Sequence, residues 1–168
     1  MSVGPAGPIL AVLDTSFWVA GYRAEVVANC LDLFDVVVPA AVEAEILAVQ
    51  ASAPQREYPY ATLFRQLRHK FHKPPAMTPT PLGRFGPGEA EAIPLALELN
   101  AVLLVNERPA AAYAANIGVQ IVTVPTVIVA LRAQGIISRR AAETKLALIA
   151  SITSPRIIEE ARHALTSL

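Results

Sequence analysis

Short runs of consecutive apolar residues alternate along the chain with longer stretches in which apolar residues recur at helical spacing. The apolar runs at 9–13, 36–38, 102–105 and 119–124 are short and lack polar alternation, as strands covered on both faces do. Strands that alternate with helices predict a mostly parallel sheet wrapped on both faces. The pattern therefore predicts an α/β fold, a three-layer α/β/α sandwich with a central parallel sheet of four to five strands, in which 9–13 lies between 36–38 and 102–105.

The stretches between the strands carry helix start and stop signals. Pro39 opens one helix at a first-turn position, and Pro109 and Gly118 bracket another. Thr15 or Ser16 can cap the helix that follows the first strand. The predicted helices are 17–20, 26–35, 39–50, 58–72, 87–100, 109–118, 126–134, 139–151 and 155–166. Loops are expected at 1–8 and at the proline-rich stretch 73–81.

Length and composition bound the organisation of the protein. With 168 residues, 1–168 is expected to be a single domain with C-terminal helices from about 126 to 166 packed on it. The chain is 54% hydrophobic, more than one core of this size needs, which predicts a homodimer or a partner interface. The expected contact surface combines 17–31 and 58–72, and its large side chains are Trp18, Tyr22, Leu63 and Phe64.

Several classes of protein are disfavoured by the composition. The apolar runs are interrupted well before membrane-spanning length, and no basic segment precedes a cleavable apolar stretch, so neither a membrane span nor a signal peptide is expected. A single cysteine, Cys30, suits a reducing cytoplasm. The net charge is zero, so a nucleic-acid ligand would need a local basic patch. The one concentrated basic segment, 65–73, fits that purpose or is an ordinary solvated helix face.

Two acidic residues directly follow predicted strands. Asp14 directly follows 9–13, and Glu107 follows 102–105 with only Asn106 between them. Ligand sites of parallel α/β sheets lie outside the carboxyl ends of the strands. We therefore expect Asp14 and Glu107 to open onto the same edge.

Two further acids lie on the apolar faces of predicted helices. Glu45 is three residues after Val42 on one helical stripe, and Glu89 is in line with Ile93 and Ala96. An unpaired carboxylate is costly in such a position. Each acid could cap a helix or pair with an arginine, but four of them in one geometric set favour a shared site.

The chemistry of these side chains favours a hard cation. Neighbouring carboxylates repel one another unless a cation lies between them. Oxygen ligands without His or Cys companions indicate Mg²⁺ or Mn²⁺ rather than zinc, as one or two ions. Such ions assist the cleavage of phosphodiesters. Nucleophilic catalysis by a side chain is disfavoured, because Cys30, Thr15 and Ser16 lack an activating base nearby in the sequence.

Four motifs together resemble the PIN-domain family. They are Val12-Leu13-Asp14-Thr15-Ser16, Val38-Pro39-Ala40-Ala41-Val42-Glu43-Ala44-Glu45-Ile46-Leu47, Gly88-Glu89-Ala90-Glu91-Ala92-Ile93 and Leu103-Leu104-Val105-Asn106-Glu107-Arg108. The resemblance spans about residues 9–134 in the family's order. The tail at 152–160 is similar to the C-terminal helix of a bacterial branch of the family.

This resemblance implies an activity and partners. The family consists of single-stranded RNA endonucleases that use Mg²⁺ or Mn²⁺, and many members are VapC-type toxins neutralised by a small antitoxin. It implies a metal-dependent endoribonuclease, a toxin-type protein of the cytoplasm, whose partners are single-stranded RNA, an antitoxin and a second copy of the chain.

The resemblance also implies roles for individual residues. It implies that Asp14, Glu45 and Glu89 bind metal and that Glu107, where the family usually has aspartate, completes the catalytic set. The residues expected to support the site or to contact substrate are Thr15, Ser16, Asn106 and Arg108. Arg84 could also clamp a phosphate, but Arg108 is favoured because it directly follows Glu107.

Two positions depart from the family pattern. The side chain of Glu107 is one methylene longer than the usual aspartate. Pro94 predicts a helix that starts late or kinks just after Glu89, which leaves Glu91 as the alternative ligand.

Two rival functions follow from these residues. A weakened active site would leave an RNA-binding or partner-binding module of the same fold. A phosphotransfer domain, such as a receiver or a haloacid-type phosphatase, would need a second acid or a well-placed lysine beside Asp14, and residues 14–18 offer neither.

Overall fold

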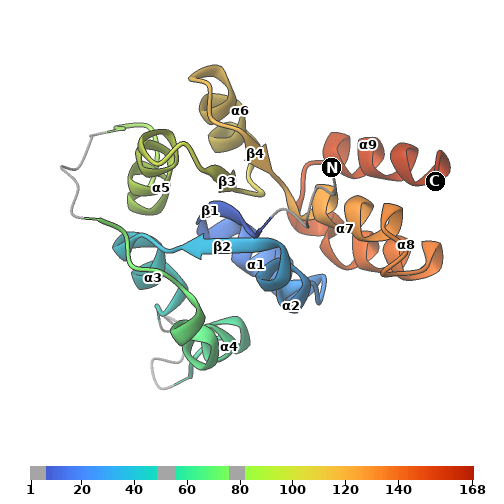
Figure 1. Ribbon diagram of the computed structural model, residues 1–168, viewed down its shortest axis with the longest axis horizontal. Coiled ribbons are helices and arrows are strands. Elements are labelled where there is room, and N and C mark those ends of the chain that lie inside the picture. Colours follow the sequence, from blue (N-terminus) through green and yellow to red (C-terminus); the bar gives the residue numbers. More distant parts are fainter. Residues whose placement is uncertain (1–6, 49–55, 76–81) are drawn as a thin grey trace, which may run out of the picture.

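The computed structural model describes residues 7–48, 56–75 and 82–168 and contains a parallel four-stranded sheet in the order β2-β1-β3-β4 (Figure 1). The strands are β1 (Ile9–Leu13), β2 (Phe34–Val37), β3 (Val102–Leu104) and β4 (Ile121–Val122). The predicted α/β class, the parallel sheet and the position of β1 between β2 and β3 are confirmed.

The register of the sheet fixes where its carboxyl edge lies. Leu13 is opposite Leu104, and the backbone N–H of Asp14 donates to the Leu104 carbonyl at 2.9 Å. The chain segments that follow β1 and β3 therefore leave the sheet side by side. This is the edge at which Asp14 and Glu107 were predicted to meet.

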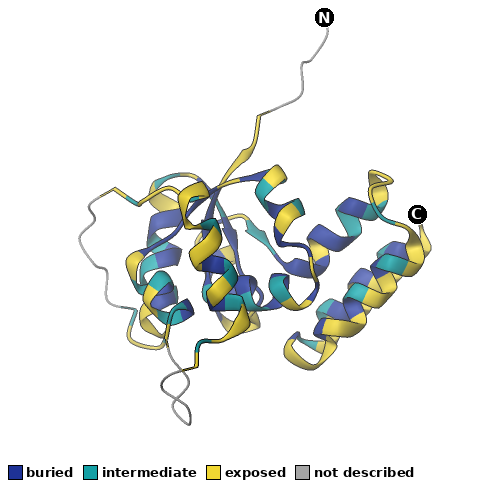
Figure 2. Cartoon of the chain, turned by 90° about the horizontal axis from the view of Figure 1, so that it is seen from below, coloured by how far each residue is buried: buried dark blue, intermediate teal, exposed yellow. Residues whose placement is uncertain are grey.

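Helices cover both faces of the sheet. They are α1 (Thr15–Arg23), α2 (Val27–Leu33), α3 (Ala40–Ile46), α4 (Pro59–Leu67), α5 (Pro87–Glu98), α6 (Arg108–Asn116), α7 (Val124–Ala133), α8 (Arg139–Ile149) and α9 (Pro155–Thr166), with 3₁₀ turns at Arg68–Lys70 and Ala150–Ile152. Right-handed crossovers between parallel strands place α1 and α2 on the opposite face from α5 and α6. Figure 2 shows that the inward helix faces and much of the sheet are buried, whereas Ile9 and Leu10 at the start of β1 are exposed.

The predicted start of β2 and the predicted end of α3 were wrong. β2 begins at Phe34, because Asp35 points to solvent between the buried Phe34 and Val36 and so interrupts the apolar run without ending the strand. α3 ends at Ile46, not near Gln50, which lies outside the described residues. The predicted loops at 1–8 and 73–81 are described only in part.

The helix predicted over 58–72 ends at Leu67. After one 3₁₀ turn, Phe71 is extended, and its ring stacks on Phe64 with centroids 5.0 Å apart. His72 then forms a parallel bridge with Val37, donating its backbone N–H to Val36 and accepting from Val38. This short extended segment covers part of the outer edge of β2, which would otherwise present unpaired backbone groups.

The C-terminal helices form a separate layer beside the sheet. α7, α8 and α9 pack on one another, and α7 and α8 also contact α1 (Figure 1). The Lys145 ammonium of α8 donates to the carbonyls of Ala24 and Glu25, each at 3.0 Å, at the C-terminal end of α1. A cation suits this end of a helix, because the last carbonyls lack intrahelical partners.

Trp18 and Phe64 are buried inside the protomer, contrary to their predicted place in an interface. Trp18 is 4% exposed and Phe64 is 0% exposed, and their rings meet edge to face at 5.2 Å. The indole N–H of Trp18 donates to the Tyr60 carbonyl at 2.8 Å. These side chains hold α4 on α1, so a second copy of the chain cannot use them as anchors. The homodimer itself stays a prediction.

No helix in the described ranges combines the length and the apolar character that crossing a bilayer requires.

Truncation of Phe64 should separate the two roles proposed for this side chain. Phe64→Ala removes a fully buried ring from the contacts with Trp18 and Phe71, and we expect it to lower the free energy of unfolding by about 3–5 kcal/mol. Leu97→Ala, at a position 50% exposed, should change it by less than about 0.5 kcal/mol. Urea unfolding measures both. A stable Phe64→Ala protein with an altered oligomeric state would favour the interface after all.

Candidate functional site

The four acids identified in the sequence lie together at the carboxyl edge of the sheet. Asp14 follows β1, Glu107 precedes α6, Glu45 lies in the last turn of α3, and Glu89 lies in the first turn of α5. The charges of Glu89 and Glu45 both act on Asp14, and those of Glu89 and Asp14 act on Glu107. The site is therefore built from four segments that are widely separated in the sequence.

Asp14 is buried and also begins a helix. It is the N-cap of α1, a role predicted for Thr15 or Ser16, since Asp caps helices as well as Ser does. Its Oδ2 accepts hydrogen bonds from the backbone N–H of Ser16 at 3.0 Å and from the Ser16 hydroxyl. Burial raises the pKa of Asp14 to about 6; the bonds from Ser16 lower it, and the nearby Glu89 and Glu45 raise it. Repulsion among the acids is thus a smaller cause than burial.

Ser16 and Asn106 connect the acid cluster to the surrounding structure through hydrogen bonds. The Ser16 hydroxyl donates to Asp14 and accepts the backbone N–H of Asn106 at 3.0 Å. Asn106 is 3% exposed; its amide donates to the Thr153 hydroxyl at 2.8 Å and accepts the backbone N–H of Val124. Asn106, predicted as a substrate contact, instead ties the end of β3 to the C-terminal helices.

Glu45 is held by two donors from different elements. The Thr15 hydroxyl donates to its Oε2 at 2.5 Å, and the backbone N–H of Gly88 donates to its Oε1 at 2.8 Å. The first N–H groups of a helix lack intrahelical acceptors and favour negative charge, so the start of α5 is a suitable partner for this carboxylate. Thr15, like Ser16, therefore positions an acid and does not point free into solvent.

Two glycines leave the space that the carboxylates occupy. A Cβ on Gly88 would lie 2.8 Å from Cδ of Glu45 and closer still to Oε2. A Cβ on Gly86 would lie 3.0 Å from Oε2 of Glu89 and 3.9 Å from Oε1 of Glu45. The Glu45 and Glu89 carboxylates therefore flank the same small space. Sequence patterns did not reveal this role, although two glycines around the helix-starting Pro87 are a visible feature.

Glu89 and Glu91 contact different parts of the structure. Oε2 of Glu91 accepts the backbone N–H of Ala41 at 2.9 Å and so caps the first turn of α3, whereas Glu89 faces Asp14 and Glu107. α5 begins at Pro87, so Pro94 does not delay its start. The hydrogen bond lost at Pro94 would have gone to the carbonyl of Ala90, the residue that follows Glu89.

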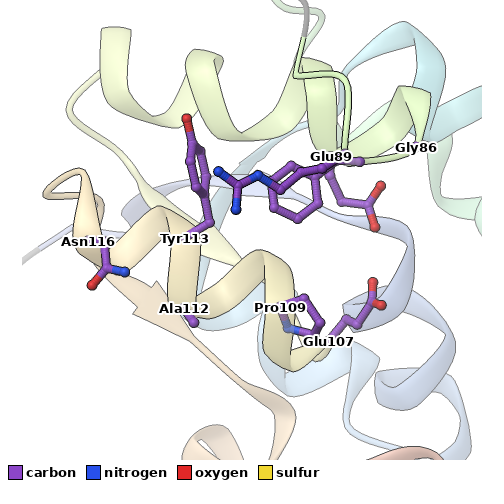
Figure 3. Close-up of a pocket in the computed structure, with 9 residues that line it drawn as sticks. Gly86, Glu89, Glu107, Pro109, Ala112, Tyr113 and Asn116 are labelled. Carbon is purple, nitrogen blue, oxygen red and sulfur yellow. The ribbon is translucent and has the colours of Figure 1, made fainter.

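Glu107 lies at the outer side of the cluster. It is the N-cap residue of α6 without a side-chain capping bond, and its carboxyl group faces that of Glu89 (Figure 3). Partial burial, a hydrogen bond with Glu89 and the charges of Glu89 and Asp14 raise the pKa of Glu107.

The carboxylates of the cluster are suitable ligands for a hard divalent cation, but they do not form a complete coordination shell. Among the described residues, no three Asp, Glu, His or Cys side chains stand close enough to ligate one ion. The acids stay apart because like charges repel. Asp14 and Glu45 are also each held in place by their own hydrogen bonds. Oδ1 of Asp14 takes part in none of the hydrogen bonds formed by the described side chains, and the glycines keep the adjoining space clear. Asp14 with Glu89 or Glu45 provides oxygen ligands of the kind that Mg²⁺ and Mn²⁺ prefer.

The arginine that lines the pocket beside the acids is Arg84, whereas the substrate contact predicted for Arg108 stays a prediction. A pocket of about 500 Å³ adjoins Glu89 and Glu107 and is lined by Arg84, whereas the exposed Arg108 does not line it. In the predicted basic segment, Arg65 pairs with Glu57, Arg68 with Glu43 and His72 with Asp35. Because acids pair with both arginines of the segment, we favour the alternative of a solvated helix face.

Comparison with known proteins agrees with the fold. The family model DUF3368, described as a PIN domain, matches residues 10–167. A PilT N-terminus domain protein from Sulfolobus solfataricus superposes with a TM-score of 0.50 at 17% identity, over 71% of this chain and 90% of that one. A domain of a functionally unknown protein from Methanocaldococcus jannaschii has a TM-score of 0.51 at 19% identity, over 69% and 91%. No curated protein matches the chain.

The raised pKa of Asp14 predicts how stability depends on pH. The native state binds this proton more tightly than the unfolded chain, so stability is lost as pH rises from about 4 to above 6, by about 3 kcal/mol in total. Asp14→Asn should therefore be more stable than the wild type at pH 7.5 in EDTA and about equal to it at pH 4. Urea unfolding at both pH values tests this, with the exposed Glu98→Gln as a control that should show no such difference. A gain in stability from Asp14→Asn that is independent of pH would contradict it.

Proposed function

This chain belongs to the PIN-domain family, and we propose that it is a metal-dependent endoribonuclease that cleaves single-stranded RNA. The observation that supports this most strongly is the gathering of Asp14, Glu45, Glu89 and Glu107 at one edge of the sheet, with Asp14 buried among like charges. Burying a carboxylate beside other carboxylates destabilises the folded state. Such arrangements are therefore more typical of functional sites than of purely structural ones.

Asp14, together with Glu45 or Glu89 from the predicted ligand set, would hold the divalent ion. A bound Mg²⁺ or Mn²⁺ supplies neutralisation of phosphate charge and activation of water. Ser16 fixes the orientation of the Asp14 carboxylate, and Thr15 with the Gly88 N–H fixes that of Glu45. These hydrogen bonds reduce the reorganisation that binding would require, as outer-shell partners of metal ligands do.

Glu107 is suited to a proton-transfer role. It lies at the outer side of the cluster, where substrate would approach, and its raised pKa brings it nearer to neutral pH. A carboxyl group of this kind can exchange a proton with the attacking or the leaving oxygen of a phosphodiester.

The toxin-type role is a finer part of the proposal. A small antitoxin and a second copy of the chain are the partners that the family resemblance implies. Large apolar side chains that remain exposed among the described residues, such as Leu97, Ile117 and Ile136, give such partners apolar surface to cover.

Purified protein should cleave single-stranded RNA in the presence of Mg²⁺ or Mn²⁺. Asp14→Asn keeps the size of the side chain and removes the charge that would hold the ion, so the rate should fall more than about 100-fold, since outer-shell partners alone are worth about 10–100-fold. Glu98→Gln, on the exposed side of α5, should cleave like the wild type. Cleavage of labelled RNA of mixed sequence, with and without EDTA, provides the measurement.

Two results would contradict this proposal in different ways. Cleavage that persists in EDTA or in Asp14→Asn would exclude the acid cluster as the active site. RNA binding without cleavage, in the wild type and in Glu107→Asp alike, would favour the alternative of a weakened PIN-fold binding module.

Gly88→Ala should separate metal binding from folding. The new methyl group would collide with the Glu45 carboxylate, which can swing away at little cost to the fold but then leaves its position in the site. We expect Mn²⁺ affinity to fall about 10–100-fold and stability to change by less than about 1 kcal/mol. Gly83→Ala, where a Cβ meets nothing within 4 Å, is the matched control. Calorimetric titration with Mn²⁺ that gave equal affinities for both variants would exclude this role of Gly88.

A further inference from the structure

The pocket beside the acid cluster contains side chains that the proposed metal site does not use. It lies between the start of α5 and the length of α6, and its lining begins at Glu89 and Glu107 and ends at Asn116 (Figure 3). Its volume of about 500 Å³ falls in the range of sites that hold small organic ligands. Because α6 has 9 residues, the pocket extends about 13 Å from the acids along that helix.

The middle of the pocket has an aromatic wall. The rings of Phe85 and Tyr113 lie 5.2 Å apart at 58°, and both side chains are partly exposed. Nucleobases stack on aromatic side chains of this kind, and such stacking does not depend on the identity of the base. The wall comes from two separate elements, the turn before α5 and the last turns of α6, so it is a feature of the fold and not of one amphipathic helix.

A cation lies against the same wall. The Arg84 guanidinium carbon is 5.1 Å from the ring centre of Tyr113 and 5.7 Å from that of Phe85. In the described part of the chain, Arg84 forms no ion pair, although Glu89 and Glu107 line the same pocket. Contact with the rings fixes the guanidinium while leaving N–H donors for a phosphate, which a planar fork binds in bidentate fashion.

The far end of the pocket offers base-edge recognition. Asn116, the last residue of α6, is exposed and carries an amide that can both donate and accept hydrogen bonds. The chemical character of the pocket therefore changes along α6. Acids lie at one end, a cation on aromatic rings lies in the middle, and an amide lies at the other end. Without a bound cation, a phosphate would be repelled at the acidic end and attracted in the middle.

We propose that this pocket seats the nucleotide that adjoins the bond to be cut in single-stranded RNA. Arg84 binds its phosphate, Tyr113 and Phe85 stack on its base, and Asn116 contacts the base edge. This inference rests on the proposed function for the direction of the strand, because the acids at the near end mark the phosphodiester that is cleaved. The stacking wall requires an unpaired base, so duplex RNA does not enter.

Binding measured without cleavage tests the pocket separately from the nuclease. The probe is a fluorescein-labelled 12-nucleotide single-stranded RNA of mixed sequence, titrated in EDTA with full-length Asp14→Asn protein and followed by fluorescence anisotropy. Arg84→Ala or Tyr113→Ala, each introduced into the Asp14→Asn protein, should weaken RNA binding about tenfold or more. Tyr113→Phe keeps the ring, so its affinity should stay within about twofold of the parent's. Arg140→Ala removes the same charge from an exposed position on α8 and is the matched control.

The salt dependence distinguishes the two contributions. Arg84→Ala should reduce the magnitude of the slope of log affinity against log salt concentration by about 1, which corresponds to one phosphate contact. Tyr113→Ala should leave that slope unchanged. Undetectable binding by the parent protein, or Arg84→Ala and Tyr113→Ala variants that bind as tightly as Arg140→Ala, would overturn the proposal. Weakened binding by both variants together with a wild type that never cleaves RNA would retain the pocket and refute the nuclease.

Discussion

Burial of the Asp14 carboxylate at the end of the central strand determines how the rest of the site is arranged. The residue is 3% exposed, and burial raises its pKa to about 6. A carboxylate in such a position must be protonated, hydrogen-bonded or neutralised by a cation. Ser16 supplies two hydrogen bonds to one oxygen, and the charges of Glu89 and Glu45 act on the same carboxylate. This arrangement is the reason why we propose a cation at these acids.

The burial of this carboxylate also explains why the site draws on so much of the chain. Acids that repel one another are kept in place in part by hydrogen-bond donors, and those of Glu45 come from two other elements. Thr15 of α1 and the Gly88 N–H of α5 hold Glu45 of α3, and Ser16 joins Asp14 to the Asn106 backbone. The helices around the sheet are therefore linked through the carboxylates as well as through the apolar core. Loss of a single donor should disturb the geometry of the site more than the stability of the fold.

The sequence predicted the architecture and the four acids, because both depend on local patterns. Uninterrupted apolar runs identify buried parallel strands, and an acid after such a run is visible without a structure. Contacts between distant segments left no such pattern. Glu89 and Glu91 could not be separated because the difference lies in the Ala41 N–H, 50 positions away. For the same reason the sequence did not indicate the buried hydrogen bonds of Asn106 or the place of Arg84 in the pocket. The roles of Gly86 and Gly88 depend on the space that two carboxylates occupy, which periodicity does not record.

Locating the ion would decide whether these acids form a divalent-cation site. Crystals of the wild-type protein grown with Mn²⁺ and measured near the manganese absorption edge would give an anomalous difference map. We expect a peak bonded to a carboxylate oxygen of Asp14 and to one from Glu45 or Glu89, and no such peak in Asp14→Asn. Manganese bound elsewhere, or the absence of any peak at these acids at millimolar Mn²⁺, would contradict the assignment.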